Sequence, residues 1–335
     1  MASSTKKLSI IIPLYNVESY VSTAADSITA QVFDELEVVA IDDGSTDHSL
    51  DVCMSHLSGV DVVVISQENI GLGGARNAGI LAATGEYVMF LDADDFLLPN
   101  AFKNIMHILV SKRPDILFGR HLRWLPNKGF FRSHPYCYDP PDNRLRRTEY
   151  ILSAWQEHPW SACRYIFRRS LIMEHGLLFE LGVLCEDIPW TLSLLERAET
   201  IEFFSEPFYA YYQRRPGSIM NQMDPKRLID LNTIVGRLLV DYSGRPVICR
   251  QLVWQSFFYI NEYCNFSSED RKRILDSYMM VLPLYNLSES KIHRMAGKCT
   301  NSVLFYGLSL TLFSMKCVKR LWMYFNVGTN YEKTA

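Results

Sequence analysis

Three carboxylates within four positions are the residues of this 335-residue chain best suited to chemistry. They are Asp92, Asp94 and Asp95, and the apolar run 87–91 leads straight into them, so a buried strand is predicted to end in concentrated negative charge. Carboxylates this close raise one another's pKa unless a cation lies between them, and their hard oxygen atoms suit Mg²⁺ or Mn²⁺. A solvated turn with Asp95 as a helix cap is the alternative, and the acidic run alone does not decide between the two.

A second acidic pair, Asp42-Asp43, follows another apolar run, and both runs belong to an alternation of strands and helices. Strands are predicted at 8–12, 36–41, 61–66 and 87–91, with helices at 17–31, 47–57 and 71–83. Such alternation predicts an α/β, Rossmann-like fold, with a mostly parallel sheet and helices on both faces. Ligands bind beyond the carboxyl ends of the strands in such sheets, so both acidic clusters are expected at one edge.

The remainder of the chain predicts a further helix and strand and then less regular structure. The helix is expected at 101–111 and the strand at 115–119, while the loop-rich segment 120–147 is either a binding loop or an insertion without a role. We expect a catalytic domain over 1–220, a helical subdomain over 221–290 and a basic, apolar C-terminal segment over 291–335.

Charge and cysteine content exclude several classes of protein. The net charge of −3 predicts no general affinity for nucleic acid, but residues 1–100 carry 3 Lys/Arg and 15 Asp/Glu, whereas residues 291–335 carry 7 Lys/Arg and one acid. The 8 cysteines include no C-x-x-C pair, so neither a zinc knuckle nor a redox motif is indicated. The short polar N-terminus lacks a signal-peptide pattern, which predicts a cytoplasmic protein with reduced thiols.

The glycines at 71–74 raise the possibility of a dinucleotide-binding loop, because they follow a strand and have Asp92 about twenty residues downstream. The match fails in detail. Arg76 replaces the third glycine, the glycines do not follow the first strand, and Asp92 belongs to a cluster. A tight turn into a helix accounts for the same glycines.

Four motifs in order resemble the family 2 glycosyltransferases of the GT-A fold, the bacterial polysaccharide type. They are Pro13-Leu14-Tyr15-Asn16, Asp42-Asp43-Gly44-Ser45-Thr46-Asp47, the run from Asn69 to Gly79, and Leu91-Asp92-Ala93-Asp94-Asp95. The resemblance is firm over about residues 7–120 and extends less closely to about 220. It implies an inverting transfer from a nucleotide-sugar donor, UDP-linked in our interpretation, to a glycan hydroxyl.

The resemblance also implies roles for individual residues at the nucleotide. Asp42 would hold the base or ribose, Arg76 would lie near the base and phosphates, and Asp92 would contact the ribose. Asp94 stands in the family's metal position and would ligate Mn²⁺ or Mg²⁺ between the phosphates. The residues assigned to the nucleotide site on this basis are Pro13, Tyr15, Asp42, Asp43, Arg76, Asp92, Arg214 and Arg215.

A further acidic pair, Glu186-Asp187, lies about ninety residues after the Asp92–Asp95 cluster and matches the family's catalytic pair. Asp187 would be the base and Glu186 would position it or the acceptor, although an acidic pair before a helix is ordinarily an N-cap. Trp160 would line the acceptor side, unless it is a core residue. Either Arg214 or Arg215 could clamp phosphate.

The uncharged stretch 299–315, flanked by Lys and Arg, favours a helix lying on a membrane surface over a packed helix or a span. We therefore expect peripheral attachment to the cytoplasmic face of the membrane and a lipid-linked glycan acceptor.

A nucleotidyltransferase is the rival enzyme, but the segment 13–16 lacks the Gly-rich basic loop that it needs. A non-catalytic carbohydrate- or lipid-binding protein is the second alternative.

Overall fold

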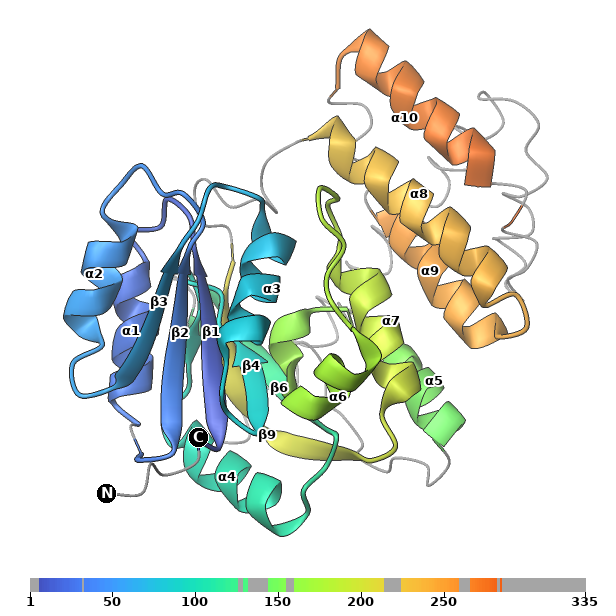
Figure 1. The fold of residues 1–335 in the computed structure, drawn as a ribbon. Helices are drawn as coiled ribbons and strands as arrows, with labels where there is room; N and C mark the ends of the chain where they lie inside the picture. Colours follow the sequence, from blue (N-terminus) through green and yellow to red (C-terminus); the bar gives the residue numbers. More distant parts are fainter. Residues whose placement is uncertain are drawn as a thin grey trace. The chain divides into compact units, whose positions relative to one another are not determined.

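The computed structural model describes residues 6–31, 33–125, 129–131, 144–154, 160–213, 224–258, 266–281 and 284. The chain divides into two compact units, Met1–Gln222 and Met223–Ala335. The first unit contains a sheet with its helices, and the second contains helices (Figure 1). The predicted domain bounds at 220 and 290 stay predictions.

The sheet of the first unit is mixed. Its strands are β1 (Leu8–Leu14), β2 (Leu36–Asp42), β3 (Asp61–Ser66), β4 (Tyr87–Phe90), β5 (Phe96–Leu97), β6 (Ile116–Leu125), β7 (Gly129–Phe131), β8 (Tyr165–Arg168) and β9 (Ile201–Tyr212). Their order is β3-β2-β1-β4-β8-β6-β9-β5, with β7 paired to β6. The predicted parallel pattern holds across β3-β2-β1-β4 and recurs between β6 and β9. The pairs β4–β8, β6–β8, β5–β9 and β6–β7 are antiparallel.

Helices cover both sides of the parallel strands. Those of the first unit are α1 (Val21–Thr29), α2 (Ser49–His56), α3 (Leu72–Ala82), α4 (Ala101–Ser111), α5 (Arg144–Ala154), α6 (Arg169–His175) and α7 (Asp187–Arg197), with a 3₁₀ turn at Ala162–Arg164. Figure 1 shows α1 and α2 on one side of β1 to β3 and α3 on the other. This layering explains why β1, β2 and β4 are apolar along nearly their whole length.

The core lies where α3 packs against β1. Ile10, Ile11 and Ile12 are fully buried, as are Val88 to Leu91 on the neighbouring strand and just after it. A Cβ built on Gly79 of α3 would lie 2.3 Å from Cγ2 of Ile11, so only glycine allows the helix to approach this strand so closely. The position of α3 on the sheet is thereby fixed.

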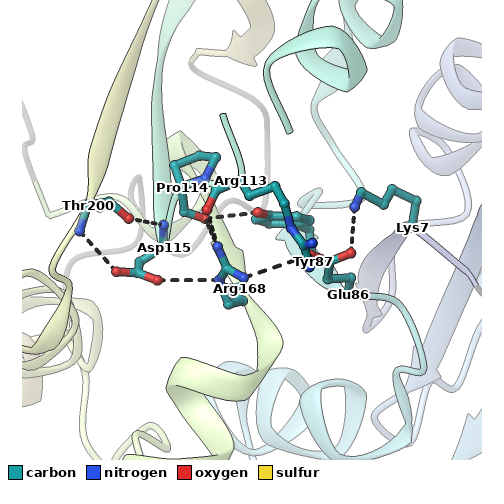
Figure 2. Close-up of polar contacts among 8 residues, drawn as sticks. All are labelled: Lys7, Glu86, Tyr87, Arg113, Pro114, Asp115, Arg168 and Thr200. Carbon is teal, nitrogen blue, oxygen red and sulfur yellow. Dashed lines mark hydrogen bonds and ion pairs between the residues drawn. The ribbon is translucent and has the colours of Figure 1, made fainter. Parts of the chain in front are cut away.

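Charged side chains join strand ends at the edge of the sheet where β1 and β4 begin (Figure 2). We name this group the basal clamp; it consists of Lys7, Glu86, Arg113, Asp115 and Arg168. Glu86 is 2.5 Å from Nζ of Lys7, 3.2 Å from Nη2 of Arg113 and 3.8 Å from Nη1 of Arg168. Nε of Arg168 lies 3.3 Å from Asp115, whose other carboxylate oxygen accepts hydrogen bonds from the backbone of Glu199 and Thr200. The clamp ties together the ends of β1, β4, β6 and β8.

The second unit contains α8 (Pro225–Asp241), α9 (Pro246–Phe258) and α10 (Ser268–Val281). A buried polar network joins them: Asn232 donates to Oγ of Ser277 at 2.9 Å and accepts from Ser256 at 2.5 Å, and the hydroxyl of Tyr278 donates to the carbonyl of Ser256 at 2.7 Å. Within the part of the chain described, no helix is long and apolar enough to cross a membrane. The basic segment 291–335 lies outside the described residues.

Candidate active site

The two acidic clusters lie at the same edge of the sheet, opposite the basal clamp. Asp42 ends β2 and pairs in register with Leu14 of β1. On the other side of β1, the backbone N–H of Leu91 donates to the carbonyl of Ile11 at 2.9 Å, immediately before Asp92. Because β1 lies between β2 and β4, the predicted convergence at the carboxyl ends of parallel strands is present.

The loops after β1 and β2 form one wall of this edge. Asn16, at a left-handed φ of 51°, accepts a hydrogen bond from the backbone of Thr46 at 2.8 Å. The backbone N–H of Val17 donates to Oγ of Ser49, the first residue of α2, at 2.6 Å, which also ties the loop after β1 to the start of that helix. Pro13 is half-buried in β1 and Tyr15 is 49% exposed, so the tyrosine ring is available to a ligand. Asp42 is half-buried and caps the turn after β2 by accepting from the backbone of Ser45 at 3.0 Å.

Asp43 is buried and holds the loop that enters α3. Its carboxylate accepts hydrogen bonds from the side chain of Gln67 at 2.7 Å and from the backbone N–H groups of Ile70 at 3.1 Å and Gly71 at 2.9 Å. Gly71 has a φ of 86°, a conformation that favours glycine. Both oxygens of Asp43 are thus engaged within the fold, and its predicted contact with the nucleotide stays a prediction.

The three aspartates after β4 differ in how far they are buried. The Asp92 side chain is 30% exposed and Asp94 is half-buried, whereas Asp95 is buried. Asp95 accepts hydrogen bonds from the hydroxyl of Tyr209 at 2.6 Å and from the backbone of Tyr212 at 2.8 Å. Burial and the charges of Asp94 and Asp92 raise the pKa of Asp95 well above its usual range. These contacts attach the cluster to β9.

Arg76 links Asp92, on the predicted nucleotide side of the site, to the predicted catalytic pair. Its Nη2 lies 2.9 Å from Asp92 and its Nη1 lies 3.1 Å from Glu186. The guanidinium is buried, with the rings of Phe90 and Phe179 5.4 Å and 5.5 Å away. Burial opposes its charge, but the surrounding negative groups prevail and raise the pKa of Arg76. Arg76 therefore bridges two carboxylates, a geometry that the sequence did not predict.

The predicted catalytic pair stands at the start of α7, where Glu186 is the N-cap residue and Asp187 is the first helical residue. The preceding Cys185 has a left-handed φ of 67°, which is costly for a residue with a side chain and is typical of functional sites. Burial and the neighbouring Glu186 raise the pKa of Asp187 to about 7, although Arg76 opposes them. Burial also raises the pKa of Glu186. A carboxylate that titrates near neutral pH is suited to act as a general base.

The predicted acceptor and phosphate residues are less well defined. Trp160 is only 2% exposed, and its carbonyl accepts a hydrogen bond from Thr191 of α7 at 2.8 Å. This burial is the core environment given above as the alternative, and a contact between its indole and the acceptor stays a prediction. Arg214 and Arg215 lie outside the described residues.

The acidic cluster offers the kind of oxygen donors that a divalent cation prefers, and a metal bound there stays a prediction. No group of three or more His, Cys, Asp or Glu among the residues described here is arranged to hold a metal. Asp94 nevertheless offers hard oxygen atoms next to two further carboxylates, and their mutual repulsion contributes to the raised pKa of Asp95. A cation at Asp94 would relieve that repulsion, with its remaining ligands coming from diphosphate oxygens.

Sequence reasoning missed two residues at the centre of the site. The hydroxyl of Tyr209 donates to Asp95 and accepts from the backbone N–H of Asp92 at 3.2 Å. The buried thiol of Cys163 lies 3.9 Å from Nη2 of Arg76, and burial raises its pKa well above the usual range. Both residues lie in apolar surroundings far along the chain, so nothing in the local sequence distinguishes them from core residues.

Comparison with known proteins shows the family. Residues 9–176, half of the chain, match the model described as Glycosyl transferase family 2. The glycosyltransferase YibD of Escherichia coli strain K12 is 31% identical over 221 residues, which span 63% of each chain and so under two thirds of that relative. The crystal structure of Staphylococcus aureus TarS residues 1–349 with UDP-GlcNAc aligns with a TM-score of 0.71 at 19% identity, over 92% of each chain.

A second solved structure, more distant, shares the fold. The mannosyltransferase PcManGT from Pyrobaculum calidifontis, in complex with GDP-Man and Mn²⁺, has a TM-score of 0.53 at 15% identity and covers 98% of this chain and 84% of its own. At such identities these likenesses establish the fold alone, and they confirm the predicted GT-A architecture. The chain belongs to the family 2 glycosyltransferases.

Proposed function

We propose that the protein is an inverting, metal-dependent glycosyltransferase that moves a sugar from UDP to a hydroxyl group of a glycan. The observation that carries the proposal is the bridge made by Arg76. A single guanidinium contacts Asp92 on the predicted nucleotide side and Glu186 next to the predicted base. One side chain thus contacts both predicted groups, which supports a displacement at the anomeric carbon, because that reaction needs the donor and the base close together.

The proposed step is a single displacement with Asp187 as the base. The acceptor oxygen forms a bond to the anomeric carbon on the face opposite the diphosphate, while the bond from that carbon to the phosphate oxygen breaks. The acceptor proton passes to Asp187, and UDP leaves with the electron pair. A pKa of about 7 leaves a substantial ionised fraction at neutral pH and makes Asp187 a stronger base than an ordinary aspartate.

Asp94 would hold the divalent ion, and the other residues of this edge would bind the nucleoside. When bound, Mn²⁺ or Mg²⁺ neutralises the charge that develops on the departing diphosphate. Tyr15 would pack against the base, and Asp42 and Asp92 would accept hydrogen bonds from base or ribose. The Mn²⁺ present in the PcManGT complex supports a metal for this fold.

Relatives support the classes of donor and acceptor. The TarS structure contains UDP-GlcNAc, and that protein is named a poly(ribitol-phosphate) beta-N-acetylglucosaminyltransferase. For this chain we accordingly propose a UDP-sugar donor and a glycan acceptor of a cell-surface polymer, carried on a lipid. The basic segment 291–335 would attach the protein to the anionic cytoplasmic face of the membrane. Deleting it should abolish sedimentation with anionic vesicles; a truncated protein that still sedimented would contradict this part.

Release of UDP tests the proposed activity. The purified chain is incubated with Mn²⁺ and a panel of UDP-hexoses and UDP-N-acetylhexosamines, and the donor is selected by thermal stabilisation, which reaches about 2.7 kcal/mol at a hundred times Kd. Asp94→Ala and Asp187→Asn should each reduce UDP release at least a hundredfold, in the range of a lost metal or base. Unchanged release in both variants would refute the assigned roles. Binding without release from the wild type would indicate a non-catalytic protein.

A further inference from the structure

We propose that one face of α3, formed by Gly73, Arg76 and Asn77, is a seat that positions the catalytic loop, residues 177–187. Asn77 is the positioning residue that no comparison assigns. These three positions are spaced i, i+3 and i+4, so they share one face of the helix. The inference rests on the proposed function, because the loop matters for catalysis only if Asp187 is the base.

Asn77 holds the loop through two hydrogen bonds to a single residue. Its Nδ2 donates to the carbonyl of Phe179 at 2.9 Å, and its Oδ1 accepts from the backbone N–H of Phe179 at 2.8 Å. Only an amide side chain offers a donor and an acceptor in this planar arrangement, since a carboxylate would present acceptors to both groups. The pair fixes both the distance and the orientation of the loop backbone relative to α3.

Gly73 lets the loop rest directly on the helix. A Cβ at this position would lie 3.1 Å from the carbonyl oxygen of Glu180, 3.2 Å from Cβ of Phe179 and 3.2 Å from Cγ of Glu186. Glycine is a poorer helix former than alanine, by about 1 kcal/mol in a helix interior and less in the first turn, where Gly73 lies. The close approach to the neighbour of the proposed base gives this glycine a function that offsets that cost.

Arg76 completes the seat by pairing with Glu186, at the end of the loop. The opposite side of the loop is held by α7, since the Trp190 indole stacks on Phe179 at 4.5 Å and donates to the carbonyl of Leu177 at 3.0 Å. The left-handed Cys185 lies between these supports and the catalytic pair. Such a conformation persists only where surrounding contacts enforce it, and the seat provides contacts on both sides of it.

For Asn77 and Gly73, the inference predicts that a substitution lowers turnover and leaves nucleotide binding unchanged. Both polar groups of the Asn77 side chain face the loop backbone, whereas donor binding is assigned to Tyr15, Asp42 and Asp92. A misplacement of about 1 Å can reduce a rate about a hundredfold, so a shift of a few tenths of an ångström should cost about tenfold. The expected signature is a lower kcat with an unchanged affinity for UDP.

The test compares Asn77→Ala, Asn77→Asp and Gly73→Ala with the control Leu81→Ala. Leu81 lies on the same helix, and its side chain is 55% exposed. We measure UDP release from the donor that the panel selects, stabilisation by UDP with Mn²⁺, and amide hydrogen exchange over residues 177–187. Each seat variant should lose kcat about tenfold, keep UDP affinity within about twofold and exchange faster across the loop, whereas the control should change none of these.

Three outcomes would overturn the inference. They are a kcat within about twofold of wild type in Asn77→Ala, an equal loss of kcat and UDP affinity, and unchanged exchange over residues 177–187. The isosteric Asn77→Asp separates the paired hydrogen bonds from packing, since a purely steric role would leave it active. An inactive wild type would contradict the proposed function instead, while the exchange experiment would still decide whether α3 holds the loop.

Discussion

Replacing the proposed base should make the protein more stable above neutral pH. Burial and Glu186 raise the pKa of Asp187 from 3.8 to about 7, against the opposing effect of Arg76. A carboxyl group whose pKa is higher in the folded than in the unfolded state favours folding only while protonated. The contribution of Asp187 to the free energy of unfolding therefore falls as the pH rises from about 4 to about 7 and is constant above that range. A carboxamide at this position cannot ionise, so the stability of Asp187→Asn should not fall with pH in this way.

The size of the effect follows from the difference between the two pKa values. A difference from 3.8 to about 7 corresponds to about 4 kcal/mol at 1.36 kcal/mol per pKa unit. Glu186 titrates together with Asp187 and shares this energy, so we expect about 2 kcal/mol above pH 7. For a unit of about two hundred residues this corresponds to a gain of about 4–8 °C in Tm.

Thermal melting between about pH 4 and about pH 8.5 measures the effect. The melting temperatures of wild type and Asp187→Asn should coincide near pH 4, separate as the pH rises and stay separated by a constant amount above about 7. Asp51→Asn is the matched control, because Asp51 also lies in the first turn of a helix but its side chain is 84% exposed. A variant that is less stable than wild type at pH 8, or a difference independent of pH, would refute the reasoning.

Three further predictions follow from single residues. With Asp187 as base, kcat/KM for wild-type transfer should fall about tenfold per pH unit below about 7, and a profile without an acid limb would contradict that role. Asp43→Asn should cost about 1–3 kcal/mol in urea unfolding, because a carboxamide cannot accept all three N–H groups that this carboxylate accepts; an unchanged midpoint would contradict it. Burial opposes ionisation of Glu86, but Lys7 and Arg113 lower its pKa, so this carboxylate stabilises the fold above its usual pKa and loses that contribution as the pH falls. Glu86→Gln should therefore lower stability by about 1–3 kcal/mol at neutral pH and leave the midpoint of the pH–rate profile unchanged.

The sequence predicted well those helices and strands whose bounds depend only on residues within or next to them. The helix at Ala101–Ser111 and the strand at Asp61–Ser66 have the predicted bounds. The first helix begins at Val21, four residues later than predicted. The backbone N–H groups of Val17 and Glu18 donate instead to the side chains of Ser49, which begins α2, and of Asp47, in the loop after β2. The strand predicted to end at Gly119 continues to Leu125 because β9 pairs with it beyond an irregularity in register. Pairing of that kind, for example between His121 and Tyr209, depends on residues almost ninety positions away and leaves no local pattern.

In the candidate site, too, the local sequence predicted some features, while others depend on residues far apart in the chain. The motifs located the carboxylates and suggested which ligand each could serve, since acidic residues after apolar runs are visible in sequence. What they could not give is the partner of each side chain. Arg76 meets Glu186 across 110 positions, and Asn77 meets Phe179 across 102. Burial likewise emerges only on folding, and it is burial that raises the pKa of Asp187.

The basal clamp separates two demands on the same strands. Glu86 of the basal clamp lies just before β4, and the acidic cluster of the candidate site lies just after it. The ion pairs that stabilise the sheet and the side chains proposed to bind substrate are therefore at opposite ends of one strand. Substitutions at distant sites with no shared partners contribute additively to stability. Stabilising substitutions in the basal clamp, natural or engineered, can therefore offset the stability lost when residues at the opposite edge are changed to alter substrate specificity.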